Sequence, residues 1–205
     1  MSEDIQKASV SGRALTRATF AEMLANNFDK LPDIDQKLFL YGPVYLGGNG
    51  SLAGLISNSL YRRALNIKQA AFSTSLPMAV LPFLTTYALY NAAVSSPLMY
   101  GDLNCPSCAV IRGALVGVVG AGLYPILLAL PVNIAIASRY STAPLPEKGQ
   151  VLRYFVELSR PIMRKMRAVL LLQGFFGTYL GSRDFDTYMK LAKITFGSSH
   201  DELKD

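Results

Sequence analysis

The chain has 205 residues, a hydrophobic fraction of 51%, no Trp and a formal net charge of +6. This length leaves room for one domain. The basic residues stand mainly at the ends of long apolar tracts, which favours contact with lipid headgroups and argues against nucleic-acid binding.

The N-terminal segment 1–37 is predicted to be a polar tail with one short amphipathic helix. Residues 2–20 lack the continuous apolar stretch of a secretory signal. Within residues 18–28, apolar side chains recur at helical spacing at Phe20, Met23, Leu24 and Phe28. Residues 29–32 are predicted to end this helix.

Four apolar tracts are predicted to form transmembrane helices. Three of them, 38–61, 69–101 and 113–138, contain no Asp, Glu, Lys, Arg or His, and a shorter charge-free tract covers 168–182. A helix of about 20 mostly apolar residues crosses about 30 Å of hydrocarbon and satisfies its own backbone hydrogen bonds. The fourth tract is short and reaches both interfaces only if flanking Arg and Lys side chains extend to the headgroups.

We therefore predict an all-α, polytopic membrane protein with a four-helix transmembrane bundle at residues 38–182. The expected spans are about 42–61, 70–97, 113–138 and 164–182, and residues 183–205 form a polar C-terminal tail. The second and third spans are expected to bend at their prolines, which are Pro77, Pro82, Pro125 and Pro131.

Four spans place both termini on the same side of the membrane. The connections after the first and third spans are rich in Lys and Arg. The positive-inside rule places such connections on the inner side. Both termini and the loop that carries the cysteines are therefore expected to face outward.

Cys105 and Cys108 form the motif with reactive potential. A C-x-x-C spacing allows a disulfide, and it also occurs in redox-active pairs. A structural disulfide, an inert pair and a redox-sensitive pair all remain open. A zinc site needs four ligands, and the sole His of the chain, His200, is far from the motif in sequence. We predict no catalytic, cofactor or metal site.

Pairs of glycines four residues apart are predicted to let helices approach closely. The pairs are Gly50 and Gly54, Gly113 and Gly117, and Gly177 and Gly181. Such a face serves either packing within the bundle or the binding of a partner's transmembrane helix. Asn58, Asn133 and Gln173 are expected to form hydrogen bonds between the helices.

Basic residues at the span ends are predicted to anchor the protein at the headgroups on the inner side. They are Arg62, Arg63, Arg164, Lys165 and Arg167. The last three also suit an anionic lipid such as cardiolipin. Because the spans hold no ionisable residue at their centres, a proton relay or an ion-coupled carrier is disfavoured.

Several segments occur together in one order along the chain. They are Asn58-Ser59-Leu60-Tyr61-Arg62-Arg63, Leu76-Pro77-Met78-Ala79, Pro82-Phe83-Leu84-Thr85-Thr86, Gly101-Asp102-Leu103-Asn104-Cys105 with Cys108, Gly122-Leu123-Tyr124-Pro125, Pro131-Val132-Asn133, Arg164-Lys165-Met166 and Tyr179-Leu180-Gly181-Ser182. Over about residues 31–182 they resemble the transmembrane protein 126 family, and the paired cysteines are more similar to its A-type branch.

This resemblance implies a non-enzymatic protein of the mitochondrial inner membrane that assists the assembly of respiratory complex I. The A-type branch is associated with maturation of the membrane arm, so the implied partners are membrane subunits and other assembly factors. The basic loops would then face the matrix, and the cysteines the intermembrane space. Two alternatives are a four-span thiol oxidoreductase that uses Cys105 and Cys108, and a small-solute transporter.

Overall fold

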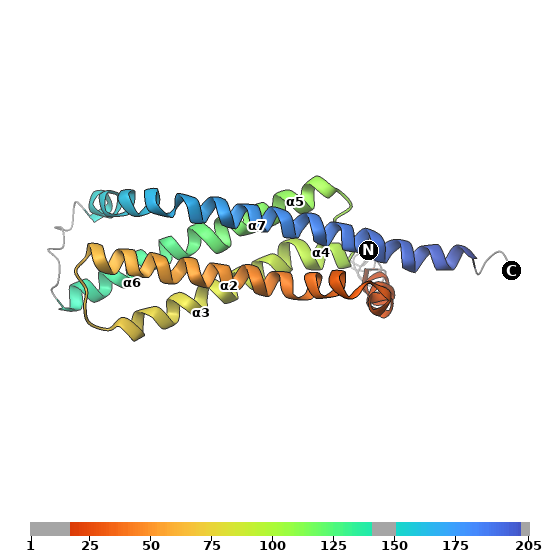
Figure 1. The fold of residues 1–205 in the computed structure, drawn as a ribbon, viewed down its shortest axis with the longest axis horizontal. Coiled ribbons are helices and arrows are strands. Elements are labelled where there is room, and N and C mark those ends of the chain that lie inside the picture. Colours follow the sequence, from red (N-terminus) through yellow and green to blue (C-terminus); the bar gives the residue numbers. More distant parts are fainter. Residues whose placement is uncertain (1–16, 141–150, 202–205) are drawn as a thin grey trace, which may run out of the picture.

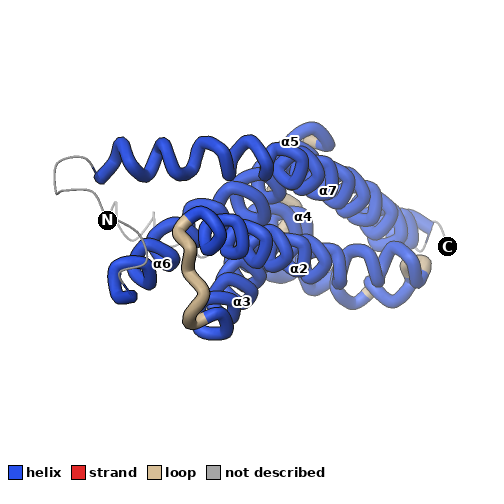
Figure 2. The backbone as a smooth tube through the Cα atoms, turned by 60° about the vertical axis from the view of Figure 1, so that its left-hand side comes forward, coloured by secondary structure: helices blue, strands red, loops and turns tan. Residues whose placement is uncertain are grey.

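The computed structural model describes residues 17–140 and 151–201, and within these ranges it consists of helices and short connections, without a strand (Figure 2). The helices are α2 (Asp33–Ala64), α3 (Ala71–Tyr90), α4 (Ser96–Met99), α5 (Pro106–Leu115), α6 (Tyr124–Tyr140) and α7 (Val151–Asp201). A further helical segment covers residues 17–26. The predicted tails lie partly outside the described residues, at 1–16 and 202–205, as does the connection 141–150.

Two pairs of helices join into longer rods through π-helical segments. Asn91–Ser95 links α3 to α4, and Val116–Leu123 links α5 to α6. These rods lie side by side with α2 and α7 along one long axis (Figure 1). The described residues therefore confirm the predicted all-α class.

The two joined rods are long and apolar enough to cross a membrane. They are Ala71–Met99 and Pro106–Tyr140, and they contain the predicted span 113–138 and all but the first residue of the predicted span 70–97. Within the described residues, α2 and α7 do not reach the same apolarity, because α2 is rich in Gly, Ser and Asn and α7 carries many charges. The predicted spans 42–61 and 164–182 therefore stay predictions.

The helices continue through the prolines that were expected to bend them. Pro77 and Pro82 lie within α3, and Pro131 lies within α6. The departures from α-helical geometry lie instead in the π-helical segments. Such segments insert an extra residue into a helical turn. The predicted proline bends stay a prediction.

Glycines of α5 and of the π-helical segment that follows it come into backbone contact with α7, and we call this contact the glycine seam. A Cβ atom at Gly177 would overlap the carbonyl oxygen of Gly113, and a Cβ atom at Gly117 would overlap that of Gln173. A Cβ atom at Gly181 would lie 2.6 Å from the carbonyl oxygen of Ala109. Because α5 and α7 are antiparallel here, the seam also sets their register.

A second close approach joins α2 to α3. A Cβ atom at Gly54 would overlap the carbonyl oxygen of Met78. Nearby, the hydroxyl of Ser51 donates a hydrogen bond to the carbonyl oxygen of Ala79 at 2.5 Å. Small side chains on α2 thus leave room for the backbone of α3.

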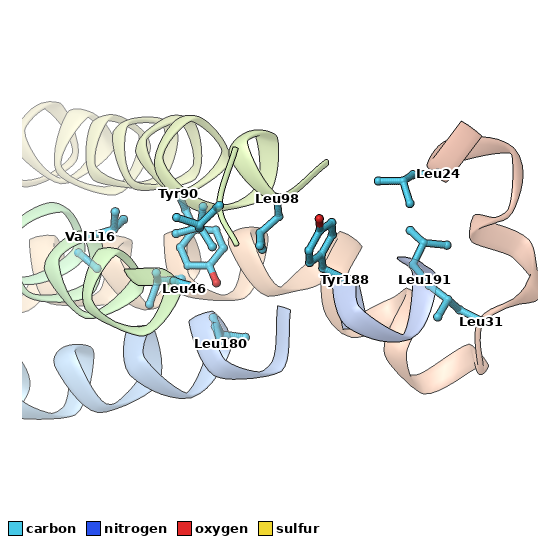
Figure 3. Packing of buried hydrophobic residues seen from close by; sticks show 13 residues of the cluster. Leu24, Leu31, Leu46, Tyr90, Leu98, Val116, Leu180, Tyr188 and Leu191 are labelled. Carbon is cyan, nitrogen blue, oxygen red and sulfur yellow. The ribbon is translucent and has the colours of Figure 1, made fainter. Parts of the chain in front are cut away.

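One end of the bundle is closed by the N-terminal helical segment. Leu24 is fully buried and lies near Leu31 and Leu191 (Figure 3). Phe20 stacks on Phe196 with ring centroids 5.6 Å apart. The segment 17–26 therefore packs on the second half of α7, which continues past residue 182, the end of the fourth predicted span, into the predicted C-terminal tail.

We expect Gly177→Ala to lower the free energy of unfolding by about 2 kcal/mol, because the new methyl group must push α5 and α7 apart. Thermal unfolding of the detergent-purified protein measures this change. Gly48→Ala is the matched control, since a Cβ atom at Gly48 meets nothing within 4 Å. The control should leave stability unchanged or raise it by about 0.5 kcal/mol. Equal thermal unfolding midpoints for Gly177→Ala and Gly48→Ala would contradict the close backbone contact at the glycine seam.

Candidate functional site

Cys105 and Cys108 lie at the N-terminus of α5. Cys105 is the N-cap residue, and its sulfur accepts a hydrogen bond from the backbone N–H of Cys108 at 3.3 Å. Pro106 begins the helix, a position where its missing N–H costs no helical hydrogen bond. The chain thus folds so that a thiol takes the capping role usually filled by Ser, Thr, Asp or Asn.

Both thiols are free in the structure, and Cys108 is exposed. Two hydrogen bonds from Cys108 lower the pKa of Cys105: the one from its side chain contributes most, and the one from its backbone N–H contributes less. A lower pKa raises the fraction of thiolate, the form that attacks disulfides. The arrangement allows thiol–disulfide exchange, and the predicted disulfide stays a prediction.

Arg62 takes part in the connection between α2 and α3. Its guanidinium donates hydrogen bonds to the carbonyl oxygen of Gln69 at 2.8 Å and to the hydroxyl of Thr74 at 3.0 Å. Between them, Asn66 adopts a left-handed conformation with φ of 53°, and the N–H of Ile67 bonds to the carbonyl oxygen of Arg62. This is a Schellman ending of α2. Arg62 therefore stabilises a turn in addition to any contact with headgroups.

The other predicted anchor residues are exposed. They are Arg63 at the end of α2, and Arg164, Lys165 and Arg167 on α7. Tyr61 and Ser159 share a hydrogen bond of 2.9 Å, which brings the two groups of cations to the same end of the bundle. A headgroup-binding role for these residues stays a prediction.

The glycines named in the sequence face helices of the same chain. Gly113, Gly117, Gly177 and Gly181 form the glycine seam, and Gly50 and Gly54 face α3. A role as a face for a partner's helix stays a prediction.

Buried amides join three helices near the opposite end from the cysteines. The Nδ2 atom of Asn133 donates to the Oδ1 atom of Asn58 at 2.8 Å, which ties α6 to α2. Asn58 in turn donates to the hydroxyl of Thr74 on α3 at 3.4 Å. Gln173 is also buried, and its Oε1 atom has no hydrogen-bond partner among the described residues.

An ionic cluster that the sequence analysis missed ties α2 to α7 at the cysteine end. The buried carboxylate of Asp35 accepts hydrogen bonds from Arg183 at 3.2 Å and from Lys190 at 2.6 Å. Next to Arg183, the carboxylate of Asp184 accepts a hydrogen bond of 2.9 Å from the hydroxyl of Tyr90. The seven-residue spacing of Arg183 and Lys190 could have indicated this cluster from the sequence, because it places two cations on one face of a helix.

The described residues hold no group of three or more His, Cys, Asp or Glu side chains placed to bind a metal ion. The polar clusters in this part of the chain connect helices to one another. The thiol of Cys108 is exposed beside them at the start of α5.

Comparison with known proteins gives relatives over most of the chain. Residues 18–198 match the family described as Transmembrane protein 126. The mouse Transmembrane protein 126A is 48% identical over 84% of this chain and 88% of its own length, and the human protein of that name is 44% identical over the same shares. The rat protein named Complex I assembly factor TMEM126B, mitochondrial, is 33% identical over 80% of this chain and 71% of its own length. No solved structure gives a significant match.

We expect Asp35→Asn to lower the free energy of unfolding by about 2 kcal/mol, because Arg183 and Lys190 lose a buried partner while remaining partly exposed themselves. Chemical denaturation in detergent measures the loss. Glu157→Gln is the control, since its pair with Arg153 is mostly exposed. This control should change stability by less than about 0.5 kcal/mol. An Asp35→Asn variant as stable as the control would show that the cluster contributes little.

Proposed function

Because this chain belongs to the transmembrane protein 126 family, we propose that it is a mitochondrial inner-membrane protein that assists the assembly of respiratory complex I. The observation that carries this proposal is the 33% identity with proteins named as mitochondrial complex I assembly factors. The higher identity with proteins named Transmembrane protein 126A supports the A-type role, maturation of the membrane arm. In this proposal the protein is not an enzyme, and it acts by binding membrane subunits of complex I.

We propose that α2 and α7 also cross the membrane, which gives four spans at about 42–61, 70–97, 113–138 and 164–182. Large apolar side chains on the outer faces of both helices support this arrangement. Leu40 and Leu52 on α2, and Leu171 and Phe175 on α7, are each more than half exposed. Contiguous apolar surface of this kind is unusual on a soluble monomer but suits lipid. Four of the five glycines of α2 lie against neighbouring helices: Gly42, Gly47, Gly50 and Gly54.

The partner-binding surface is proposed to be an outward face of the bundle. The glycine faces are covered by helices of the same chain, so they are closed to a partner while the bundle is intact. The outer face of α7 offers Leu171, Leu172 and Phe175, all exposed. Exposed Arg164, Lys165 and Arg167 lie directly before this face, where they would bind an anionic lipid such as cardiolipin or an acidic subunit.

The proposed orientation places the basic connections toward the matrix and the cysteines with both termini toward the intermembrane space. One observation supports it. Arg63 and Lys165 lie near the Tyr61–Ser159 contact at one end of the bundle, and the start of α5, which carries the cysteines, lies toward the other (Figure 1). The positive-inside rule assigns the basic end to the matrix.

A membrane-impermeant maleimide should label Cys105 and Cys108 in mitoplasts, in which only the outer membrane is opened. The matched control is Lys68→Cys in a Cys105→Ser, Cys108→Ser background, because Lys68 is exposed in the connection between α2 and α3. This control should react only after the inner membrane is permeabilised. The reverse pattern would overturn the orientation, and labelling of both without permeabilisation would overturn the four-span topology.

Cells that lack this protein should contain less complex I and should accumulate incomplete membrane-arm intermediates, while the other respiratory complexes stay unchanged. Native gel electrophoresis measures both. Membrane subunits of complex I should also copurify with the protein from mild detergent. Normal complex I in its absence would contradict the proposal.

The same cells distinguish assembly from thiol chemistry, the alternative that the capped pair at α5 favours. A Cys105→Ser, Cys108→Ser variant should restore complex I as fully as the original chain, since Ser also caps a helix. If the original chain restores complex I and the double variant does not, the protein acts as a thiol oxidoreductase and the non-enzymatic proposal is wrong.

A further inference from the structure

An apolar groove of about 470 Å³ lies between the N-terminal half of α2 and α7. Its walls include Leu38, Tyr41 and Tyr45 from α2, and Phe176 and Tyr179 from α7. The residues that line it on α2 extend from Ile34 to Tyr45. At 1.5 Å per residue the groove is therefore about 16 Å long, parallel to the helix axis.

The groove begins at the edge of an apolar tract. Lys37 stands in its wall at one end, and the charge-free tract 38–61 follows directly. Further along, Gly42 contributes no side chain, and a Cβ atom there would lie 3.1 Å from the tip of Leu180. The groove thus leads from a cation at the proposed membrane interface toward the hydrocarbon.

Lys37 is available to a ligand. Arg183 and Lys190, the cations of the neighbouring ionic cluster, are both bound to Asp35. Lys37 is exposed and forms no ion pair within residues 17–140 and 151–201. An unpaired cation at the mouth of an apolar groove is complementary to an anionic group that carries a long apolar chain.

Charge favours a lipid over a helix as the occupant. The groove of about 470 Å³ has one cation, Lys37, beside apolar and tyrosine side chains, and an acyl chain with an anionic headgroup complements this lining. A hydrocarbon chain is also narrower than a helix, which is about 10 to 12 Å across with its side chains. The hydroxyls of Tyr41, Tyr45 and Tyr179 suit the border between apolar and polar regions, where tyrosine is common in membrane proteins.

We propose that this groove binds one acyl chain of an anionic phospholipid, with the lipid phosphate on Lys37. The inference rests on the membrane placement of α2 and α7 proposed above. Lipid tails are as apolar as the groove itself, so apolar burial gives little preference for one lipid over another. The preference comes from the net negative charge of the headgroup beside Lys37, because a zwitterionic headgroup carries the same phosphate together with a cation.

The test uses the full chain reconstituted in phosphatidylcholine vesicles that contain a small amount of a photoreactive lipid. The photoreactive group sits on the acyl chain, and the headgroup is either phosphatidylglycerol or phosphatidylcholine. Mass spectrometry locates the crosslinks. The variants are Lys37→Gln, which removes the charge, Leu38→Trp, which fills the groove, and Lys193→Gln, an exposed lysine outside the groove.

Phosphatidylglycerol should label the peptides around Tyr41, Tyr45 and Phe176 several-fold more than phosphatidylcholine does. Lys37→Gln should abolish this preference, and Lys193→Gln should retain it. Leu38→Trp should reduce labelling by both lipids at these positions.

Three outcomes would overturn the proposal: equal labelling by the two lipids, an equal effect of Lys37→Gln and Lys193→Gln, and an unlabelled groove. An unlabelled groove together with labelled Leu52 and Leu171 means that a second copy of the chain covers the site. If Leu52 on α2 and Leu171 and Phe175 on α7 are also unlabelled, the membrane placement of these two helices is wrong, because all three side chains are exposed outside the groove. Failure of the groove and failure of the proposed topology are therefore distinguishable.

Discussion

The contact between the backbones of α5 and α7 is the constraint on which this bundle depends. In lipid, helices gain little from burying apolar side chains against each other, so close packing and polar contacts must hold them together. Gly113 and Gly177 meet with no space for a side chain on either helix. Because α7 and the rod Pro106–Tyr140 that begins with α5 are both long, this contact fixes which residues of α7 reach the loop at Cys105 and which reach α2.

Polar contacts then hold the two ends of the bundle. At one end, Asn58 and Asn133 connect α2 with α6. At the other, Asp35 binds two cations of α7. Each is buried, so each loses more when a partner is removed than an exposed pair would. The end that contains Asp35 also carries the capped thiols and the apolar groove. The reactive group and the proposed lipid site therefore lie where an ionic cluster ties α2 to α7.

The sequence predicted the helical class and located the helices around 70–97 and 113–138, because absence of charge is a local property. It did not reveal that α7 continues from Val151 to Asp201. Charges past residue 182 read as a tail, yet Arg183 and Lys190 are paired with Asp35, more than a hundred residues away. The spacing of Gly113 and Gly117 predicted a close approach but not which helix approaches. The sequence analysis assigned Arg62 to the headgroups and did not foresee its hydrogen bond with the α2–α3 turn. That turn depends on the left-handed conformation of Asn66, which the sequence pattern did not indicate.

The order in which the chain is made gives the glycine seam a further consequence. Translation produces Gly113 and Gly117 before Gln173 and Gly177, the residues of α7 that cover them. Until α7 is in place, these glycines leave a stripe of uncovered backbone, the kind of surface that small-residue helices of other proteins recognise. A chain truncated ahead of α7 would keep that stripe uncovered.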